Sequence, residues 1–210
     1  MDRPAAKSFS GARFLLSAAA PPHLPPDQGV EVAFAGRSNA GKSSAINTLT
    51  GRHGLARISK TPGRTRLVNY FELQPGARLV DLPGYGYAEV SNAERAGWPS
   101  LLEALRQRSS LRGLFLIVDA RRGVQDEDRE LIAWADPSLR AVHVLLTKSD
   151  KLKRNEARAA HDKARKLLGT DATVQMFSSQ DGEGLADGRR RLAAMLGQKT
   201  PATLQPPGSD

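Results

Sequence analysis

Gly36-Arg37-Ser38-Asn39-Ala40-Gly41-Lys42-Ser43 is the stretch that decides the fold of this 210-residue chain. It follows a short apolar strand predicted over residues 30–35 and precedes a helix predicted over residues 43–49. A loop of the form Gly-x4-Gly-Lys-Ser between a strand and a helix is a phosphate-binding P-loop. Its glycines let backbone N–H groups turn towards phosphate oxygens, and the start of the helix adds a dipole that favours an anion. An ordinary turn with an exposed lysine is the alternative, and the flanking strand and helix argue against it.

All residues of this loop are expected to contact the phosphates of a nucleotide: Gly36, Arg37, Ser38, Asn39, Ala40, Gly41, Lys42 and Ser43. The Lys42 ammonium group would neutralise the β- and γ-phosphates, and the Ser43 hydroxyl would coordinate Mg²⁺. A P-loop alone does not distinguish ATP from GTP, or a kinase from a switch, so the rest of the chain has to decide.

The second motif is Asp81-Leu82-Pro83-Gly84, at the end of a strand predicted over residues 78–81. The Asp81 carboxylate can hold Mg²⁺ through water, and the Gly84 N–H group can contact a γ-phosphate. A strand-ending turn would have the same composition. The position of the motif after a P-loop favours the nucleotide-binding interpretation.

The third motif, Thr147-Lys148-Ser149-Asp150, follows a buried strand predicted over residues 141–146. The Asp150 carboxylate can accept hydrogen bonds from N1–H and the 2-amino group of guanine. Adenine has neither donor, so it would leave the carboxylate unpaired in a closed site. The aliphatic part of Lys148 can lie across the base, and Ser178-Ser179 would close over it. This motif is the main argument for GTP over ATP, and against an ATP-using kinase or ATPase.

The polar loop between the first predicted helix and the second predicted strand carries Lys60-Thr61-Pro62-Gly63-Arg64-Thr65-Arg66. A threonine there can complete the Mg²⁺ shell and sense the γ-phosphate, and we favour Thr65 over Thr61. A solvated loop is the alternative for each single residue.

Strand and helix signals alternate along the whole chain. Strands are predicted over 30–35, 67–73, 78–81, 113–118, 141–146 and 174–177, and helices over 43–49, 98–108, 126–135, 154–168 and 185–196. This alternation predicts an α/β protein in three layers, whose mostly parallel six-stranded sheet contains one antiparallel strand. Residues 1–28 form an N-terminal arm, residues 29–197 the GTPase domain, and residues 198–210 a disordered C-terminal tail.

The composition limits the setting and the partners. The net charge of +9 and the isoelectric point near 10.2 favour polyanionic partners, nucleic acid before an anionic membrane, with a merely soluble basic surface as the alternative. The chain has no cysteine, which is typical of a reducing cytoplasm, and it has no apolar run of the ~18 residues that a membrane span needs. Residues 14–20 only superficially resemble a signal-peptide core. We expect a cytoplasmic monomer.

The motifs together match a known family. The segments EVAFAGRSNAGKSSAIN, KTPGRT, DLPGYGYA, TKSD and FSS, in this order, resemble the EngB/YihA/YsxC family of bacterial GTPases, within the translation-factor-related class. The resemblance covers roughly residues 10–197. It implies a Ras-like GTPase domain, dependence on Mg²⁺, a role in assembly of the large ribosomal subunit, and a link to normal septation and cell division.

The resemblance also places contacts by position. It implies phosphate contacts at the P-loop, at Gly63, Arg64, Thr65, Arg66 and Leu67, and at Asp81, Leu82, Pro83 and Gly84. It implies base contacts at Thr147, Lys148, Ser149, Asp150, Phe177, Ser178 and Ser179, and Mg²⁺ ligands at Ser43 and Thr65. Thr147 departs from the wider GTPase pattern, where many relatives carry asparagine, so hydrogen bonds that brace the loop are expected to differ.

Hydrolysis is expected to be slow. Ras-like enzymes orient the attacking water with a glutamine after the DxxG glycine, and here that residue is Tyr85, which lacks the paired donor and acceptor of an amide. Asn39 either binds K⁺ beside the phosphates, as in relatives with asparagine there, or only braces the loop. The catalytic candidates are Lys42, Thr65, Gly84 and Asn39.

Several cations have an open role. Arg37, Arg64 and Arg66 could be mistaken for catalytic arginine fingers, although surface or ribosomal RNA contacts suit them at least as well. Arg154, Arg158, His161 and Arg165 recur on one stripe of the predicted 154–168 helix, either as a solvated face or as an RNA contact. The leading function is a GTP switch that acts on the large ribosomal subunit, and the alternative is a GTP-controlled binding module at the division site.

Overall fold

The computed structural model describes residues 9–56, 67–85, 92–136 and 140–197; the side chains of residues 92–98 are outside this description. Within these residues the sheet contains β1 (Arg13–Ala18), β2 (Val30–Gly36), β3 (Val68–Gln74), β4 (Ala77–Asp81), β5 (Leu111–Asp119), β6 (Ala141–Thr147) and β7 (Thr173–Met176). The helices are α1 (Lys42–Thr50), α2 (Asn92–Arg106), α3 (Asp126–Ala135), α4 (Arg154–Leu168) and α5 (Leu185–Met195), with short 3₁₀ turns at Pro21–His23 and Ser149–Lys151.

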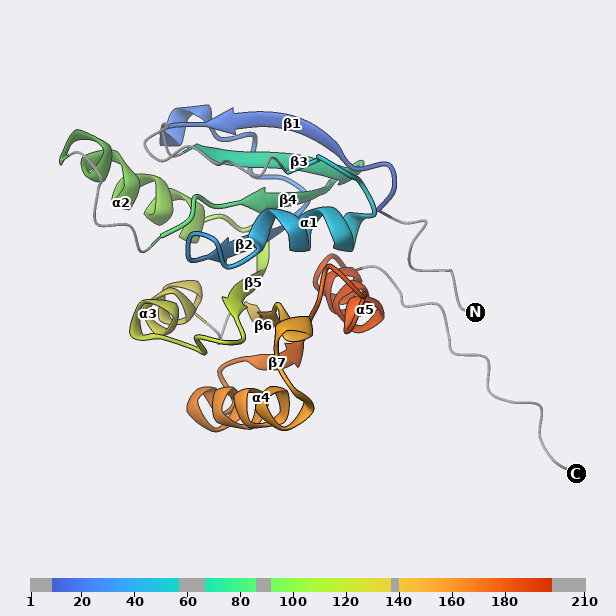
Figure 1. Ribbon diagram of the computed structural model, residues 1–210. Helices are drawn as coiled ribbons and strands as arrows, with labels where there is room; N and C mark the ends of the chain where they lie inside the picture. Colours follow the sequence, from blue (N-terminus) through green and yellow to red (C-terminus); the bar gives the residue numbers. More distant parts are fainter. Residues whose placement is uncertain (1–8, 57–66, 86–91, 137–139, 198–210) are drawn as a thin grey trace, which may run out of the picture.

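The sheet confirms the predicted fold class (Figure 1). Its order is β1-β3-β4-β2-β5-β6-β7, and β3 runs opposite to the other six strands. The prediction of six strands is one short, because β1 joins the sheet as an edge strand beside β3. A bulge between Phe14 and Leu16 interrupts the alternation of β1, and Phe14 and Leu15 stay exposed, so this segment lacks the pattern of a half-buried strand.

Helices cover both faces of the sheet, as a three-layer α/β fold requires. One core cluster contains Leu101 and Leu105 of α2, Ile132 of α3 and Ala164 of α4. The second cluster, on the other face, contains residues of α1 and α5 together with Phe34 and Phe115. The interior strand β5 is buried on both faces, which accounts for its near-continuous apolar sequence.

The chain reverses its strand order at β2, whose neighbours are β4 on one side and β5 on the other. In open α/β sheets ligands bind at the carboxyl ends of the strands beside such a switch point. The P-loop follows β2, Asp81 ends β4, and Asp119 ends β5, so the predicted phosphate site lies at this edge.

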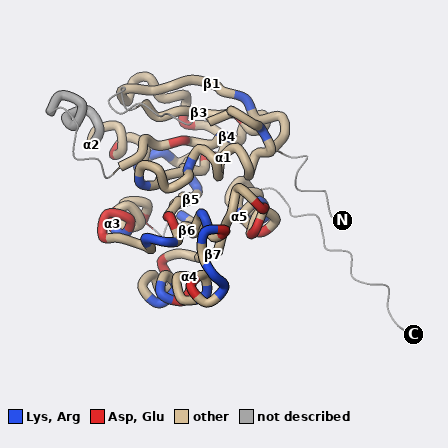
Figure 2. The backbone as a smooth tube through the Cα atoms, viewed as in Figure 1, with Lys and Arg blue, Asp and Glu red and all other residues tan. Residues whose placement is uncertain are grey.

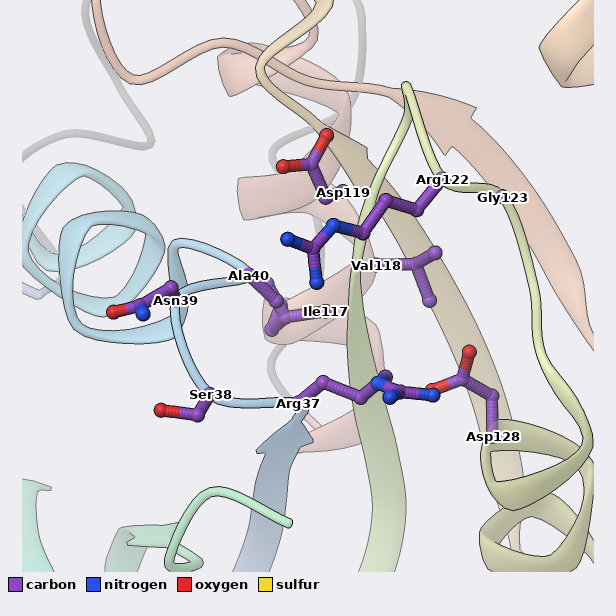
Figure 3. Close-up of a pocket in the computed structure, with 10 residues that line it drawn as sticks. All are labelled: Arg37, Ser38, Asn39, Ala40, Ile117, Val118, Asp119, Arg122, Gly123 and Asp128. Atoms are coloured by element: carbon purple, nitrogen blue, oxygen red, sulfur yellow. The ribbon is translucent and has the colours of Figure 1, made fainter. Parts of the chain in front are cut away.

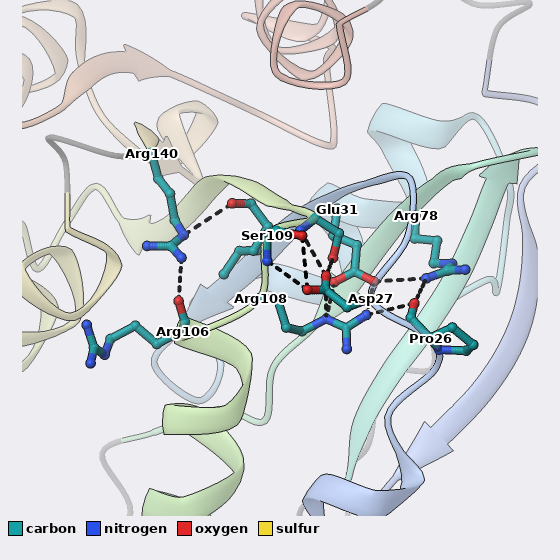
Figure 4. Close-up of polar contacts among 10 residues, drawn as sticks. Pro26, Asp27, Glu31, Arg78, Arg106, Arg108, Ser109 and Arg140 are labelled. Atoms are coloured by element: carbon teal, nitrogen blue, oxygen red, sulfur yellow. Dashed lines mark hydrogen bonds and ion pairs between the residues drawn. The ribbon is translucent and has the colours of Figure 1, made fainter.

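A buried ion-pair cluster lies at the other end of the strands, where β2, β4 and β5 begin (Figure 4). The fully buried Glu31 carboxylate at the start of β2 accepts hydrogen bonds of 2.8 Å from both Nε and Nη2 of Arg108, and one of 3.1 Å from Arg78. The same two arginines donate to the Pro26 carbonyl oxygen, at 2.9 and 3.1 Å. Since a buried carboxylate is costly without such partners, this cluster ties the approach to β2 firmly to the sheet.

Candidate nucleotide-binding site

The P-loop adopts a backbone that its sequence makes possible. Asn39 and Gly41 have φ angles of 62° and 97°, in the left-handed region that asparagine and glycine tolerate best. At Gly36 a Cβ atom would lie 2.6 Å from the Ile117 carbonyl oxygen, so only glycine allows β2 to lie this close to β5. Gly41 is the N-cap of α1, and the helix therefore begins directly behind the loop, where its N–H groups and dipole favour an anion.

Lys42 and Asp81, predicted to serve the phosphates and Mg²⁺, lie together in the structure. The Lys42 ammonium group forms an ion pair with the Asp81 carboxylate, and both side chains are largely buried. Because β2 and β4 are adjacent, this pair lies at the carboxyl edge of the sheet, with Ser43 in the first turn of α1. A hydroxyl and a carboxylate are hard oxygen ligands of the kind that Mg²⁺ accepts when phosphate oxygens and water complete its shell. The residues present therefore fit this ion.

The segment after Asp81 lies against the P-loop. A Cβ atom at Gly84 would be 3.3 Å from the Ser38 Cα atom, and the Ser38 N–H group donates to the Tyr85 carbonyl oxygen at 3.1 Å. Arg37 and Tyr85 form an isolated parallel bridge, which extends the pairing of β2 with β4 across the loop. Gly84 and the P-loop are thus neighbours, as a shared phosphate site requires.

The Tyr85 side chain is anchored to α3. Its hydroxyl donates a hydrogen bond to the Asp128 carboxylate, which is fully buried and also accepts from the Gln125 N–H group at 2.8 Å. Burial raises the pKa of both Tyr85 and Asp128. Arg37 reaches the same helix through an ion pair of 3.0 Å with Glu127. The sequence patterns did not indicate Asp128, since its partner is distant in the chain.

A small cavity lies behind the P-loop, between the loop, β5 and the start of α3 (Figure 3). Its volume is about 10 Å³, enough for about one water molecule. Arg37, Asp119, Arg122 and Asp128 contribute charged groups to its lining. The cavity is too small for a nucleotide.

The residues predicted to contact the base brace the P-loop from the other side. The Thr147 hydroxyl lies within hydrogen-bond reach of the carbonyl oxygens of Ala40 and Val118, and it can donate to one of them at a time. The Lys148 ammonium group donates to the Asn39 carbonyl oxygen at 2.6 Å and pairs with Asp119 at 2.9 Å. Thr147 therefore still braces the loop, through a hydroxyl where many relatives have an amide.

Asp119 is a further residue of this site that the sequence motifs did not single out. Although burial acts against it, hydrogen bonds from Arg121 and Lys148 hold the pKa of Asp119 well below its usual range. An aspartate that ends an apolar strand at the carboxyl edge of a parallel sheet is the signal that could have identified it.

Asp150, predicted to contact the base, is held in place by a hydroxyl group and a cation. The Ser178 hydroxyl donates to its carboxylate at 2.9 Å and Lys151 pairs with it at 3.2 Å; these groups lower the pKa of Asp150. The Ser149 N–H group reaches the Phe177 carbonyl oxygen at 3.4 Å, which joins the two predicted base loops. Asp150 therefore stays ionised and directed towards the loop that carries Ser178.

The remaining predicted contacts are only partly described. Leu67, Leu82, Pro83 and Ser179 lie within the described residues, on the segments that flank these loops. The predicted Mg²⁺ ligand Thr65 lies outside them, as do Gly63, Arg64 and Arg66. None of the described helices is long and apolar enough to cross a membrane.

Comparison with known proteins places this geometry in a family. Residues 31–148 match the family described as 50S ribosome-binding GTPase. The chain is 52% identical over 193 residues to a probable GTP-binding protein EngB of Aromatoleum aromaticum, covering 90% of this chain and 89% of that protein. The chain belongs to the EngB family of GTP-binding proteins. The EngB protein of an Escherichia coli strain, O139:H28, is 47% identical over 198 residues, covering 92% and 94% of the two chains.

Solved structures agree with this assignment at the level of the fold. The crystal structure of a probable GTP-binding protein engB aligns with a TM-score of 0.64 and 22% identity, over 80% of this chain and 99% of that one. A crystal structure of Era from Aquifex aeolicus bound to GDP·AlF₄⁻ aligns with a TM-score of 0.60 and 19% identity, over 84% and 60%. The EngB family resemblance and the GTPase fold predicted from the sequence are thus both confirmed, and the chain is a member of a family of GTP-hydrolysing enzymes.

Proposed function

We propose that this EngB-family chain binds GTP and GDP with Mg²⁺ and hydrolyses GTP, and that it acts as a switch in assembly of the large ribosomal subunit in the cytoplasm. The observation that carries the nucleotide part is the convergence of the P-loop, Asp81 and Asp150 on one edge of the sheet. The functional unit proposed is the domain spanning residues 29–197, acting as a monomer. Residues 1–28 form an arm whose strand β1 joins the sheet of this domain beside β3, and the predicted C-terminal tail, residues 198–210, lies outside the described residues.

The proposed chemistry divides among the loops. The N–H groups of the P-loop and the Lys42 ammonium group hold the phosphates, while Ser43, Asp81 and Thr65 serve the metal ion, Thr65 by resemblance. When bound, Mg²⁺ neutralises charge that develops on the phosphate oxygens. Lys42 exchanges its pairing with Asp81 for a phosphate contact, since both partners compete for the same ammonium group. Gly84, next to Ser38, supplies an N–H group for the γ-phosphate.

The orientation of the Tyr85 side chain supports slow intrinsic hydrolysis of GTP. Its hydroxyl is engaged by Asp128 on α3, so the residue in the position of the Ras-like glutamine does not serve the attacking water. Water positioning then falls to another group. Asn39, whose carbonyl oxygen is held by Lys148, is the candidate for a K⁺ site that would supply positive charge beside the phosphates.

The ribosomal part is supported by charge and by the family. The chain carries 31 lysines and arginines against 22 acidic residues, and α4 with its flanks is rich in lysine and arginine (Figure 2). The matched family is described as ribosome-binding, and a positive surface suits ribosomal RNA. A link to cell division and septation would then follow from ribosome supply.

Co-sedimentation with ribosomal subunits tests this proposal. The purified chain is mixed with large subunits in GTP, in a non-hydrolysable GTP analogue, in GDP and without nucleotide. Nucleotide-dependent association with the large subunit is expected. Absence from the large subunit in every nucleotide state would overturn the ribosomal part and favour a binding module at the division site.

The proposed role of Asn39 is tested by measuring GTP turnover in K⁺ and in Na⁺, with and without ribosomes. Unchanged turnover on replacement of K⁺ by Na⁺ would remove that role.

A further inference from the structure

The edge strand β7 is bordered by a wide groove that the nucleotide site does not use in full. The groove has a volume of about 710 Å³ and runs between α4 and the segment 181–187, and at one end it reaches Ser149 and Asp150. Its floor contains the partly buried side chains of Val174 and Met176. Three members of the cation stripe on α4, Arg154, Arg158 and His161, line this groove, whereas Arg165 does not.

The backbone of β7 offers hydrogen-bonding groups to the groove. β7 ends the sheet, and its only strand neighbour among the described residues is β6, to which it runs parallel. The Phe177 N–H group donates to the Leu146 carbonyl oxygen at 2.9 Å, so alternate residues from Thr173 onward face β6. The main-chain groups of Val174 and the N–H group of Met176 therefore face outward, in the plane where a further strand would pair.

The two walls of the groove carry opposite charges. The α4 wall holds Arg154, Arg158 and His161, and the side chain of Arg158 is 85% exposed. The other wall holds Asp181 and Glu183, both exposed, and Asp187 of α5. Within the part of the chain that the structure describes, the ion pairs of these residues stay on their own wall: Arg158 pairs with Asp162 of α4, and Asp187 with Arg190 of α5.

The acidic wall would repel a nucleic acid, because its phosphates carry negative charge along the whole strand. A polypeptide strand instead points successive side chains to opposite sides of a sheet. It can therefore present acidic side chains to α4 and basic side chains to the 181–187 segment, while its main chain pairs with β7. We propose that this groove is a docking site for an extended protein segment of alternating acidic and basic residues, which adds a strand to β7.

The probes are two octapeptides of identical composition and zero net charge. One alternates glutamate and lysine, and the other has four glutamates followed by four lysines. Fluorescence anisotropy of the labelled peptides with the full chain, without nucleotide, separates this test from the proposed GTPase function. The alternating peptide is expected to bind about tenfold more tightly than the block peptide, because opposite charges stabilise each wall and like charges oppose it. Two further forms of the alternating peptide carry N-methyl groups on every second amide, one form on the amides that face β7 and the other on those that face away. Only the form methylated towards β7 should bind more weakly.

Charge reversal of the walls gives the sharper result. Arg154→Glu with Arg158→Glu should weaken the alternating peptide by about tenfold, and Glu183→Lys with Asp187→Lys should do the same. All four substitutions together exchange the walls, and a shift of the peptide by one residue satisfies them again, so binding should return. Lys163→Glu with Lys166→Glu changes the charge of α4 equally, outside the groove lining, and serves as the control.

Three results would overturn the proposal. The two peptides could bind equally, or binding could ignore the walls and follow the control variant. In the third case a single-stranded uridine 12-mer would bind and lose affinity in the Arg154→Glu, Arg158→Glu variant, while the alternating peptide gained nothing over the block peptide. That outcome would make the stripe an RNA contact.

Discussion

Replacement of Tyr85 by phenylalanine removes one hydroxyl group and keeps the ring. In the structure that hydroxyl donates to the fully buried Asp128 carboxylate, whose other described donor is the Gln125 N–H group at 2.8 Å. A hydrogen bond to a charged group contributes about 1.5–3 kcal/mol. We expect Tyr85→Phe to lower the free energy of unfolding by about 2–3 kcal/mol, measured by urea denaturation without nucleotide.

Tyr70→Phe is the matched control. The Tyr70 hydroxyl is also buried, but it has no hydrogen-bond partner in the described part of the molecule, so its loss should be neutral or slightly stabilising. A double variant with Asp128→Asn should be less destabilised than the sum of the two single changes, since both break the same contact. If Tyr85→Phe costs no more than Tyr70→Phe, the anchoring of Tyr85 to α3 is refuted, and with it the proposed cause of slow hydrolysis.

Three further outcomes follow from the described contacts. Arg108→Met leaves the buried Glu31 carboxylate with Arg78 as its remaining cation. The substitution should lower the free energy of unfolding in urea by about 3–5 kcal/mol. A decrease below about 1 kcal/mol would contradict the burial of an ionised Glu31. Burial lowers the pKa of His143 from 6.5 to about 4, so the unfolded chain binds the proton first as the pH falls. The free energy of unfolding should therefore decrease by about 3 kcal/mol between these two pH values. A His143→Gln variant should lack this pH dependence, and an equal dependence in both proteins would assign it to another group. Thr147→Val should weaken GDP about tenfold in a fluorescent-nucleotide titration while Thr147→Ser retains it, and equal affinities would mean that the hydroxyl does not brace the P-loop.

Local patterns predicted much of the fold. The bounds of α3 and α4 agree with the sequence prediction, and Ala164 and Leu168 lie on the buried face of α4 as their spacing indicates. The P-loop was predictable because its residues are contiguous and each has a local conformational or chemical reason. β1 was not, because a bulge and two exposed apolar residues conceal its alternation.

The contacts between distant segments could not be read from the sequence. Tyr85 and Asp128 are 43 residues apart, and Lys148 reaches the Asn39 carbonyl oxygen across 109 residues. Helical periodicity placed the α4 cations on one stripe, yet only the packing of α4 against β7 reveals the groove that Arg154, Arg158 and His161 line. Such pairings depend on the strand order of the sheet. Hydrophobic patterns limit the possible strand orders but do not determine which one the chain adopts.

The nucleotide preference of an Asp150→Asn variant tests the central claim most directly. In wild-type protein, fluorescent GDP should be displaced by GTP and not by ATP. The substitution removes a carboxylate that would accept two hydrogen bonds from guanine, so affinity for GDP should fall by about 10²- to 10⁴-fold. Affinity for xanthosine diphosphate should rise, because an amide can donate to the carbonyl oxygen that replaces the 2-amino group. Unchanged GDP affinity in the variant, or displacement by ATP as effective as by GTP, would contradict guanine recognition at this site.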